Sequence, residues 1–512
     1  MYRADARAPR AWMDTLAAVL VAGGYFLVLA FCYPHDAFSL SPDEGINAIK
    51  ALLVDRGHRL YLDVWNDQPP LFTHLLRAWF TLFGWDIVRG RVLIMLFAAL
   101  LVFAVYDLVR RCWGHVAALA GVLLLCSSMY FLVLSVSLMI GMPSIACAML
   151  SLWALVRWRP ADRWGWLLAS ALLMAVSLTI KVFTLFLVPL LAAWLVVVSA
   201  LRRRPRAWAP ALAWLFVVAT VSAVLLVALV PRGGLQQLVA PHAAAEMVDS
   251  LASRHGFPVL LRIVPFDFPL VLLASLGTVV VLTRRCWDLA LLPAWAAAAF
   301  ALLCLHAPVW YHHYLLLSAV AGPMGGVAVA EIVRWPGAAA VHAGRTSWIV
   351  RGIGALAVLL LAVSLPTKYQ LAARERLDTG ERAEAALNAV RAFADGRTVV
   401  LTDAPMYAFR AGLEVVPELA VTSVKRVATG HLTSDDLLAG VARYAPDEVL
   451  LTDRFPPAAS QALLDAMRDR YRLVLDSAGA PRIRLYVRDD IVMARARPAG
   501  EPTFAARPDT AW

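Results

Sequence analysis

Two adjacent carboxylates, Asp43 and Glu44, follow the first long apolar stretch of the chain. A carboxylate beside a membrane interface suits general base catalysis or metal binding. Glu44 also has a local explanation, because Ser41 three residues before it would complete a helix capping box and Pro42 suits a first helical turn. That explanation does not account for Asp43, which therefore stays a candidate for general base catalysis or for metal binding.

Several further residues could bind an anionic substrate. Gln68 precedes two prolines, although a proline pair also favours a tight entry into a helix. Lys181 lies between two apolar stretches, and a lysine at membrane depth is costly, so it either snorkels to the headgroups or serves a function. Arg89 and Arg91 open the second apolar stretch, where an arginine is often only an anchor.

A third group lies at the start of a late apolar stretch, in the sequence Trp310-Tyr311-His312-His313-Tyr314. One interpretation is an aromatic belt at the membrane interface. The other is hydrogen bonding of these side chains to a phosphate or a sugar. Two adjacent histidines diverge on a helix and are a weak metal signal. The sequence contains no P-loop, nucleophile elbow or zinc-protease motif.

Composition shows what must position these residues. Of the 512 residues, 61% are hydrophobic and 16% are charged, and the mean hydropathy of +0.69 excludes a soluble globular enzyme. The net charge of +11 does not indicate nucleic acid, because the excess falls within residues 1–367, where 27 Lys and Arg face 16 Asp and Glu. The excess of basic residues is therefore attributed to membrane topology, and the lipid bilayer is the expected environment.

The apolar stretches predict a polytopic α-helical membrane protein with about eleven transmembrane helices. The N-terminal arginines indicate a retained signal anchor with its N-terminus in the cytoplasm. Arginine clusters then occur in every second connection between helices. An odd number of transmembrane helices places the C-terminal region on the outer side of the membrane. The predicted stretches lie near residues 15–33, 88–109, 116–135, 142–157, 165–181, 182–200, 208–230, 265–283, 288–305, 314–333 and 350–367.

Two outer connections are long, near residues 34–87 and 231–264. The first has apolar residues at helical spacing but is too short to span, which predicts interfacial helices. After the membrane domain of residues 1–367, the chain alternates helical segments with strands near 398–402 and 448–452. This pattern predicts a small α/β domain over residues 368–493 with a partly parallel sheet. The Pro-, Ala- and Arg-rich end, residues 494–512, is predicted to be disordered.

These motifs resemble the glycosyltransferase C superfamily, in the branch of protein O-mannosyltransferases, the lipid A aminoarabinose transferase and rhizobial lipopolysaccharide galacturonosyltransferases. The resemblance covers residues 15–367 in layout. The residues that carry it are Asp43-Glu44, Gln68-Pro69-Pro70-Leu71, Phe83-Gly84, Arg89, Arg91, Thr179-Ile-Lys181 and His312-His313-Tyr314. Departures are Gln68, where the family often has Lys or His, and Ile46, where the aminoarabinose branch has a basic residue. That branch also has an acidic residue in the turn that reads Ile140-Gly-Met-Pro143 here.

The resemblance implies sugar transfer from a polyprenyl-phosphate donor to an envelope acceptor on the periplasmic side of a bacterial inner membrane. The acceptor would be a glycolipid, a glycan or a protein. Asp43 would act as the base of an inverting displacement, with Glu44 beside it. Lys181, Arg89 and Arg91 would stabilise the donor phosphate. Gln68, His312, His313 and Tyr314 would contact substrate. The resemblance specifies no cofactor and leaves a divalent cation open.

Two other functions compete with this one. A transporter or flippase of lipid-linked sugars should show repeated halves and ionisable residues at mid-bilayer, whereas the sequence shows no internal repeat. A degenerate scaffold would have lost its catalytic groups, whereas Asp43 and Lys181 are retained. The α/β domain is expected to cover the cavity and help select the acceptor. Residues 405–412 are its predicted contact surface, unless their side chains only pack the domain against the membrane part.

The arginine pattern yields a topology test. Residues 202–206 and 284–285 should be cytoplasmic, and the region after residue 367 should be outside. An alkaline phosphatase fusion after Leu371 should therefore be active, and a fusion after Arg204 should be inactive. The reverse pattern would overturn both the orientation and the chemistry assigned to the outer face.

Overall fold

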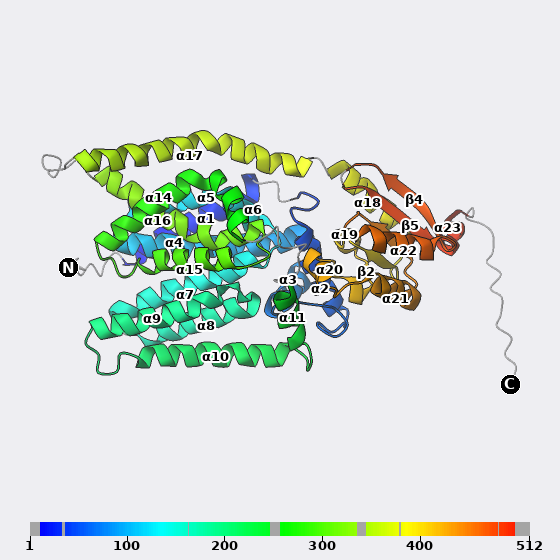
Figure 1. Cartoon of the computed structure of the whole chain (residues 1–512), viewed down its shortest axis with the longest axis horizontal. Coiled ribbons are helices and arrows are strands. Elements are labelled where there is room, and N and C mark those ends of the chain that lie inside the picture. The colour runs from blue at the N-terminus through cyan, green and yellow to red at the C-terminus, as the bar shows by residue number, and fades with distance from the viewer. Residues whose placement is uncertain are drawn as a thin grey trace.

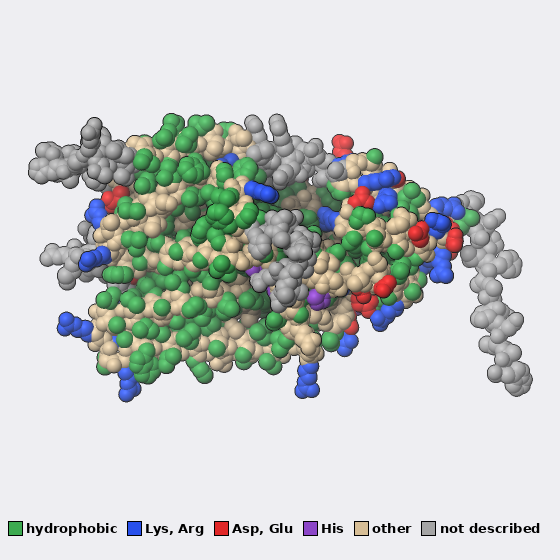
Figure 2. Space-filling model, in the orientation of Figure 1, with side chains coloured by type: hydrophobic (Ala, Val, Ile, Leu, Met, Phe, Trp, Pro, Cys, Tyr) green, Lys and Arg blue, Asp and Glu red, His purple; other side chains and the backbone are tan. Residues whose placement is uncertain are grey.

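A computed structural model describes residues 11–32, 36–161, 163–245, 256–334, 345–377, 380–479 and 481–496. The chain forms a long helical bundle with a small α/β domain at one end (Figure 1). Hydrophobic side chains cover the visible face of the bundle, whereas acidic and basic side chains gather on the α/β domain (Figure 2). This division matches a membrane-embedded body that carries a water-exposed domain.

The bundle helices coincide with the predicted apolar stretches. They are α1 (Ala11–Cys32), α4 (Ile87–Trp113), α5 (His115–Cys126), α6 (Met129–Val136), α7 (Gly141–Ala161), α8 (Trp164–Ile180), α9 (Leu187–Leu201), α10 (Ala209–Leu229), α14 (Phe268–Thr283), α15 (Leu291–Leu305), α16 (Leu315–Arg334) and α17 (Arg345–Leu377). Within the described residues, seven helices are long and apolar enough to span, and α5 with α6, bent by 77°, gives an eighth. Three shorter apolar helices, of 10–17 residues, are also present, and the count of about eleven transmembrane helices stays a prediction.

Close helix packing holds this bundle together. A Cβ atom added to Gly326 of α16 would lie 2.3 Å from the carbonyl oxygen of Ala117 on α5. Only glycine allows the two backbones to approach so closely, as in other membrane helix pairs. The close contact fixes α16, whose N-terminal end follows the histidine pair.

The arginine-rich connections meet at the end of the bundle opposite the α/β domain (Figure 1). The buried carboxylate of Asp107 accepts hydrogen bonds from Arg110, Arg111 and Arg157, which joins α4 to α7. Asp14 of α1 pairs with Arg110 at 2.9 Å. The predicted alternation of connections is therefore present in the fold, and its orientation across a membrane stays a prediction.

The long outer connections contain the predicted short helices: α2 (Pro42–Asp55) and α3 (Leu71–Phe83) in the first, and α11 (Leu235–Ala245) and α13 (Gly256–Ile263) in the second. α2 is enclosed by protein, since its residues from Glu44 to Val54 are all buried. It lies between the bundle and α19 (Met406–Ala411) of the α/β domain, where a Cβ atom on Gly45 would lie 2.6 Å from the Met406 nitrogen. Contacts with the bundle on one side and with α19 on the other therefore fix the position of α2.

The α/β domain contains a five-stranded sheet in the order β2-β1-β3-β5-β4. β1 is parallel to β2 and β3, and β5 is antiparallel to β3 and β4. The strands are β1 (Val399–Thr402), β2 (Glu414–Val415), β3 (Glu448–Leu451), β4 (Tyr471–Ser477) and β5 (Ile483–Arg488), and the other helices are α18 (Gly380–Phe393), α20 (Val424–Ala428), α21 (Ser434–Tyr444), α22 (Pro457–Met467) and α23 (Asp489–Ala496). The partly parallel sheet agrees with the prediction. The predicted domain boundary at residue 367 falls inside α17, and of the predicted disordered tail, residues 497–512 lie outside the described residues.

One buried acid within this domain has no visible partner. Glu448 is fully buried at the start of β3, and within the described part of the chain neither of its carboxylate oxygens has a hydrogen-bond partner. Burial, reinforced by the charge of Asp447, raises the pKa of Glu448 from 4.5 to about 8. The folded domain therefore holds a proton here that the unfolded chain loses above its lower pKa.

A pH-dependent stability follows for Glu448. Because the pKa is higher in the folded state, stability should fall as the pH rises from about 4.5 to about 8. Glu448→Gln needs no proton, so it should stabilise the domain at pH 8 by on the order of 2 kcal/mol and flatten this slope. Unfolding of a 380–496 fragment, followed by circular dichroism, measures both, with the exposed Glu381→Gln as the matched control. An unchanged slope in Glu448→Gln would contradict the assignment.

Candidate active site

A cavity of about 490 Å³ lies between the bundle, the outer connections and the α/β domain. Its walls come from α2, the segment after α6, the connection between α8 and α9, α11, the segment before α16, and the loop before α20. The polar lining includes Asp43, Asn47, Lys50, Asp67, Gln68, Lys181, His242, His306, His312, His313, Lys425 and Arg454. Four cationic side chains thus face two carboxylates, which favours an anionic ligand.

Asp43 lies in this cavity at the start of α2. Ser41 is the helix N-cap, and its hydroxyl accepts a hydrogen bond from the Asp43 nitrogen at 3.4 Å. Burial raises the pKa of the Asp43 carboxyl, and the charges of Lys181 and Lys50 oppose that rise. A carboxylate that is partly desolvated but flanked by cations is a stronger base than an ordinary one and can still ionise.

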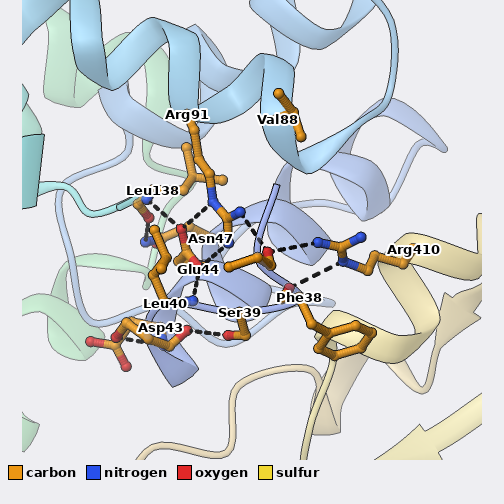
Figure 3. A network of polar contacts seen from close by, with 12 residues as sticks. Phe38, Ser39, Leu40, Asp43, Glu44, Asn47, Val88, Arg91, Leu138 and Arg410 are labelled. Atoms are coloured by element: carbon orange, nitrogen blue, oxygen red, sulfur yellow. Dashed lines mark hydrogen bonds and ion pairs between the residues drawn. The ribbon is translucent and has the colours of Figure 1, made fainter. Parts of the chain in front are cut away.

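The neighbouring Glu44 points away from the cavity into a buried polar network (Figure 3). Its two oxygens accept hydrogen bonds from Arg91 at 2.9 and 2.7 Å, and both side chains are fully buried. The same oxygens accept the backbone nitrogens of Leu40 at 2.6 Å and Leu138 at 2.8 Å. Asn47 donates to the Leu138 carbonyl. Glu44 thus contacts Leu40, one residue before the N-cap, and its acceptor sites are filled by protein.

Lys50 belongs to the cavity, although the sequence motifs did not single it out. It is buried two helical turns after Asp43, and its ammonium donates to Asn66 Oδ1 at 2.9 Å. Burial lowers the pKa of Lys50 to about 8, against the attraction of Asp67 and Asp43. The spacing of seven residues, which places both side chains on one helix face, is the signal that could have identified it.

Lys181 lies at the C-terminal end of α8, where the helix ends and the chain becomes extended. Its ammonium is 5.1 Å from the centroid of the Phe183 ring, within cation–π range. The ring of His313 lies 4.2 Å from the same Phe183 ring. His312 also lines the cavity, so the structure brings Lys181 and the histidine pair to the wall that Asp43 faces.

The α/β domain contributes the other two cations, Lys425 and Arg454. The ammonium of Lys425 forms an ion pair with Asp67 and lies 3.3 Å from His242 Nε2. Burial opposes the ionisation of Asp67, but this pair lowers the pKa of Asp67 below its usual value. No local sequence pattern connects Lys425 with a carboxylate more than 350 residues earlier, which is why motif reasoning missed it.

The remaining predicted residues divide between two places. Gln68 lines the cavity, and its carbonyl accepts hydrogen bonds from the side chains of Asn66 and Tyr61. Tyr314 is buried outside the cavity lining and packs against Tyr130. Arg89 is exposed, also outside this lining. Among the residues that the structure describes, no group of three or more His, Cys, Asp or Glu side chains is arranged to hold a metal ion.

The segment predicted to contact the acceptor, residues 405–412, packs the α/β domain onto the first outer connection, and its residues 405–407 also line a second, smaller pocket. Tyr407 lies against Phe38 with a ring-centroid distance of 4.7 Å, and Phe409 lies against Phe80 at 5.3 Å. Arg410 donates to the carbonyls of Ala37 and Phe38 (Figure 3). These contacts correspond to the packing alternative, and they hold the domain over the cavity.

Comparisons with known proteins agree with this architecture. Residues 67–227 match the family model of dolichyl-phosphate-mannose-protein mannosyltransferases. ArnT from Cupriavidus metallidurans, solved bound to undecaprenyl phosphate, superposes with a TM-score of 0.64 at 16% identity, over 96% of this chain and 100% of that one. The archaeal oligosaccharyltransferase AglB from Archaeoglobus fulgidus, in complex with an inhibitory peptide and a dolichol-phosphate, gives 0.53 at 13%, over 97% and 76%. A search of curated proteins finds no match.

The chain therefore shares the fold of these two proteins along almost its whole length, and part of its membrane domain, residues 67–227, matches the mannosyltransferase family model.

The Glu44–Arg91 pair yields a stability test. Glu44→Gln leaves the buried charge of Arg91 without a counter-charge, which costs about 3–5 kcal/mol in comparable cases. This variant should lower the melting temperature of the purified full chain and its accumulation in membranes. Asp43→Asn, one residue away, should leave both near wild type.

A second substitution separates a structural from a catalytic role for Glu44. Arg91→Met added to Glu44→Gln removes the unpaired charge, so the double variant should be more stable than Glu44→Gln alone. A Glu44→Gln protein with wild-type stability would contradict the structural role.

Proposed function

We propose that this protein is a membrane glycosyltransferase that moves a sugar from a polyprenyl-phosphate donor to an envelope acceptor on the periplasmic side. The observation that carries the proposal is the placement of Asp43 in a cavity with Lys50, Lys181 and Lys425. A phosphate leaving group needs cations, and an acceptor hydroxyl needs a base. This cavity supplies both kinds of group at the end of the bundle that carries the α/β domain.

The proposed reaction is one displacement. The acceptor oxygen attacks the anomeric carbon of the donor sugar while the Asp43 carboxylate takes the hydroxyl proton. The bond between that carbon and the phosphate oxygen breaks, and its electron pair stays on the lipid phosphate. The ammonium of Lys181 stabilises this charge, and Lys50 adds a second positive charge to the same cavity from the α2 side. Attack opposite the leaving group inverts the anomeric configuration.

The apolar part of the cavity lining fits a lipid-linked donor. Leu134 of α6 and Met139 and Ile140 beyond it line the cavity beside the polar groups. Leu134 and Met139 are buried among the bundle helices, and α6 is bent by 77° from α5. A polyprenyl chain can therefore remain against apolar helices while its phosphate reaches Lys181. The undecaprenyl phosphate and dolichol-phosphate named for the two similar structures support a ligand of this chemistry.

The same geometry supports different roles for the two arginines predicted to bind the donor. Arg91 forms a buried ion pair with Glu44 and therefore acts as a positioning residue for α2. Arg89 lies on the exposed surface, so it serves the span end as an anchor. The donor phosphate therefore depends on lysines of the cavity wall.

The proposal is tested by replacing the base. Asp43→Asn keeps the size of the side chain but cannot accept the proton, so transfer should fall at least 100-fold while the protein still accumulates. Mass spectrometry of envelope glycolipids, glycans and proteins from a deletion strain should reveal the missing product. Complementation with wild type should restore this product, and complementation with Asp43→Asn should not.

The control is Asp55→Asn, because Asp55 is an exposed acid at the other end of α2. This variant should restore the product like wild type. A deletion strain with an unchanged envelope, or full rescue by Asp43→Asn, would refute the proposed function.

A further inference from the structure

A second, smaller pocket of about 200 Å³ lies between the first outer connection and the α/β domain. One wall is formed by residues 38–42, and the other by residues 404–407 together with Thr452 and Pro481. It shares Ser41, Pro42 and Arg454 with the large cavity, so the two spaces meet beside Asp43. Pockets for drug-sized ligands are larger, about 300–1,000 Å³, so this one fits a sugar-sized group.

Arg454 stands at the junction of the two pockets on a tightly held turn. The buried carboxylate of Asp403 accepts the backbone nitrogens of Thr452 and Arg454, both at 2.8 Å, and the Thr452 hydroxyl at 3.0 Å. Between them, Asp453 has a φ of +59°, in the left-handed region that L-residues rarely adopt. Surrounding contacts must maintain such a conformation, and strained residues cluster at functional sites.

This turn projects a cation toward the base. The side chain of Arg454 is exposed and lines both pockets, whereas its backbone nitrogen donates a hydrogen bond to Asp403. Its charge acts on the Asp43 carboxyl across the junction. The three lysines lie in the large cavity alone, and Arg454 is the cation that the small pocket shares with it. A guanidinium at that place suits a planar or tetrahedral anion.

We propose that the small pocket is the acceptor site, and that Arg454 binds an anionic group, a phosphate or a carboxylate, on an acceptor sugar whose hydroxyl faces Asp43. This inference rests on the proposed glycosyl transfer. The donor phosphate occupies the lysine-lined side near Lys181, and the acceptor enters between Ser41 and the α/β domain. The two substrates then meet at Asp43 from different sides, as a single displacement requires. The size of the pocket favours a sugar over a folded protein.

Calorimetric titration of the full chain in detergent tests the site. The large cavity is first saturated with undecaprenyl phosphate, and glucose 6-phosphate, glucuronate and glucose are then titrated separately. At least one of the two acids should bind at least tenfold more tightly than glucose, and the tighter acid identifies the anion. Arg454→Gln should weaken that acid at least tenfold and leave undecaprenyl phosphate binding unchanged. Arg454→Lys should retain part of the affinity.

The controls separate this site from the donor site. Arg468→Gln, an exposed arginine after α22, should bind all probes like wild type. Equal binding of glucose and both acids, or unchanged acid binding in Arg454→Gln, would overturn the acceptor site. Loss of undecaprenyl phosphate binding in Arg454→Gln would move this arginine to the donor. Lys181→Met should weaken undecaprenyl phosphate alone; if it does not, the proposed donor site fails while the Arg454 result stands.

Discussion

The buried ion pair between Glu44 and Arg91 is the constraint on which the site depends. Two fully desolvated charges are tolerated only when geometry and hydrogen bonding compensate for the lost water. Here Arg91 donates twice to Glu44, and two backbone nitrogens complete the carboxylate. The pair connects the start of α2 to α4 and to the segment after α6. Because Glu44 is fixed inward, its neighbour Asp43 is directed into the cavity.

The α/β domain forms the other half of the same arrangement. It packs on α2 through α19, and Arg410 reaches the backbone carbonyls just before α2. Its Lys425 pairs with Asp67 of the first outer connection, and its Arg454 stands between the two pockets. The cavity is therefore composite, since neither the bundle nor the α/β domain alone supplies all its charged groups. This explains why a domain without a catalytic motif of its own lies directly over Asp43.

Much of the fold could be predicted because its signals are local. Each apolar stretch coincides with a helix, and β1 and β3 appear where strands were predicted near residues 398–402 and 448–452. The two-residue β2 and the one-turn α20 were missed, because so few residues carry no periodic pattern. Asp43 could be selected from sequence, because the capping box predicted for Glu44 left Asp43 without a structural reason. That box did not form, since Glu44 accepts from the Leu40 nitrogen and from Arg91 instead of from the Ser41 nitrogen.

Much of the candidate site could not be predicted because it depends on tertiary contacts. The spacing of Asp43 and Glu44 in the sequence does not reveal that the two side chains point in different directions. The direction of Glu44 is set by its ion pair with Arg91 of α4. Lys425 and Arg454 enter the cavity from a domain that begins more than 300 residues later. Arg89 and Arg91 look alike in sequence, yet one is exposed and the other fully buried, because they lie two residues apart on a helix.

The stereochemistry of transfer tests the central claim, that Asp43 acts as a base in a single displacement. Proton NMR of the donor sugar and of the first product formed by the purified protein gives the anomeric configuration of each. The account predicts that the configuration inverts, because the acceptor attacks opposite the leaving phosphate. Retention of configuration would contradict a single displacement opposite the leaving phosphate, and with it the role assigned to Asp43 in that step.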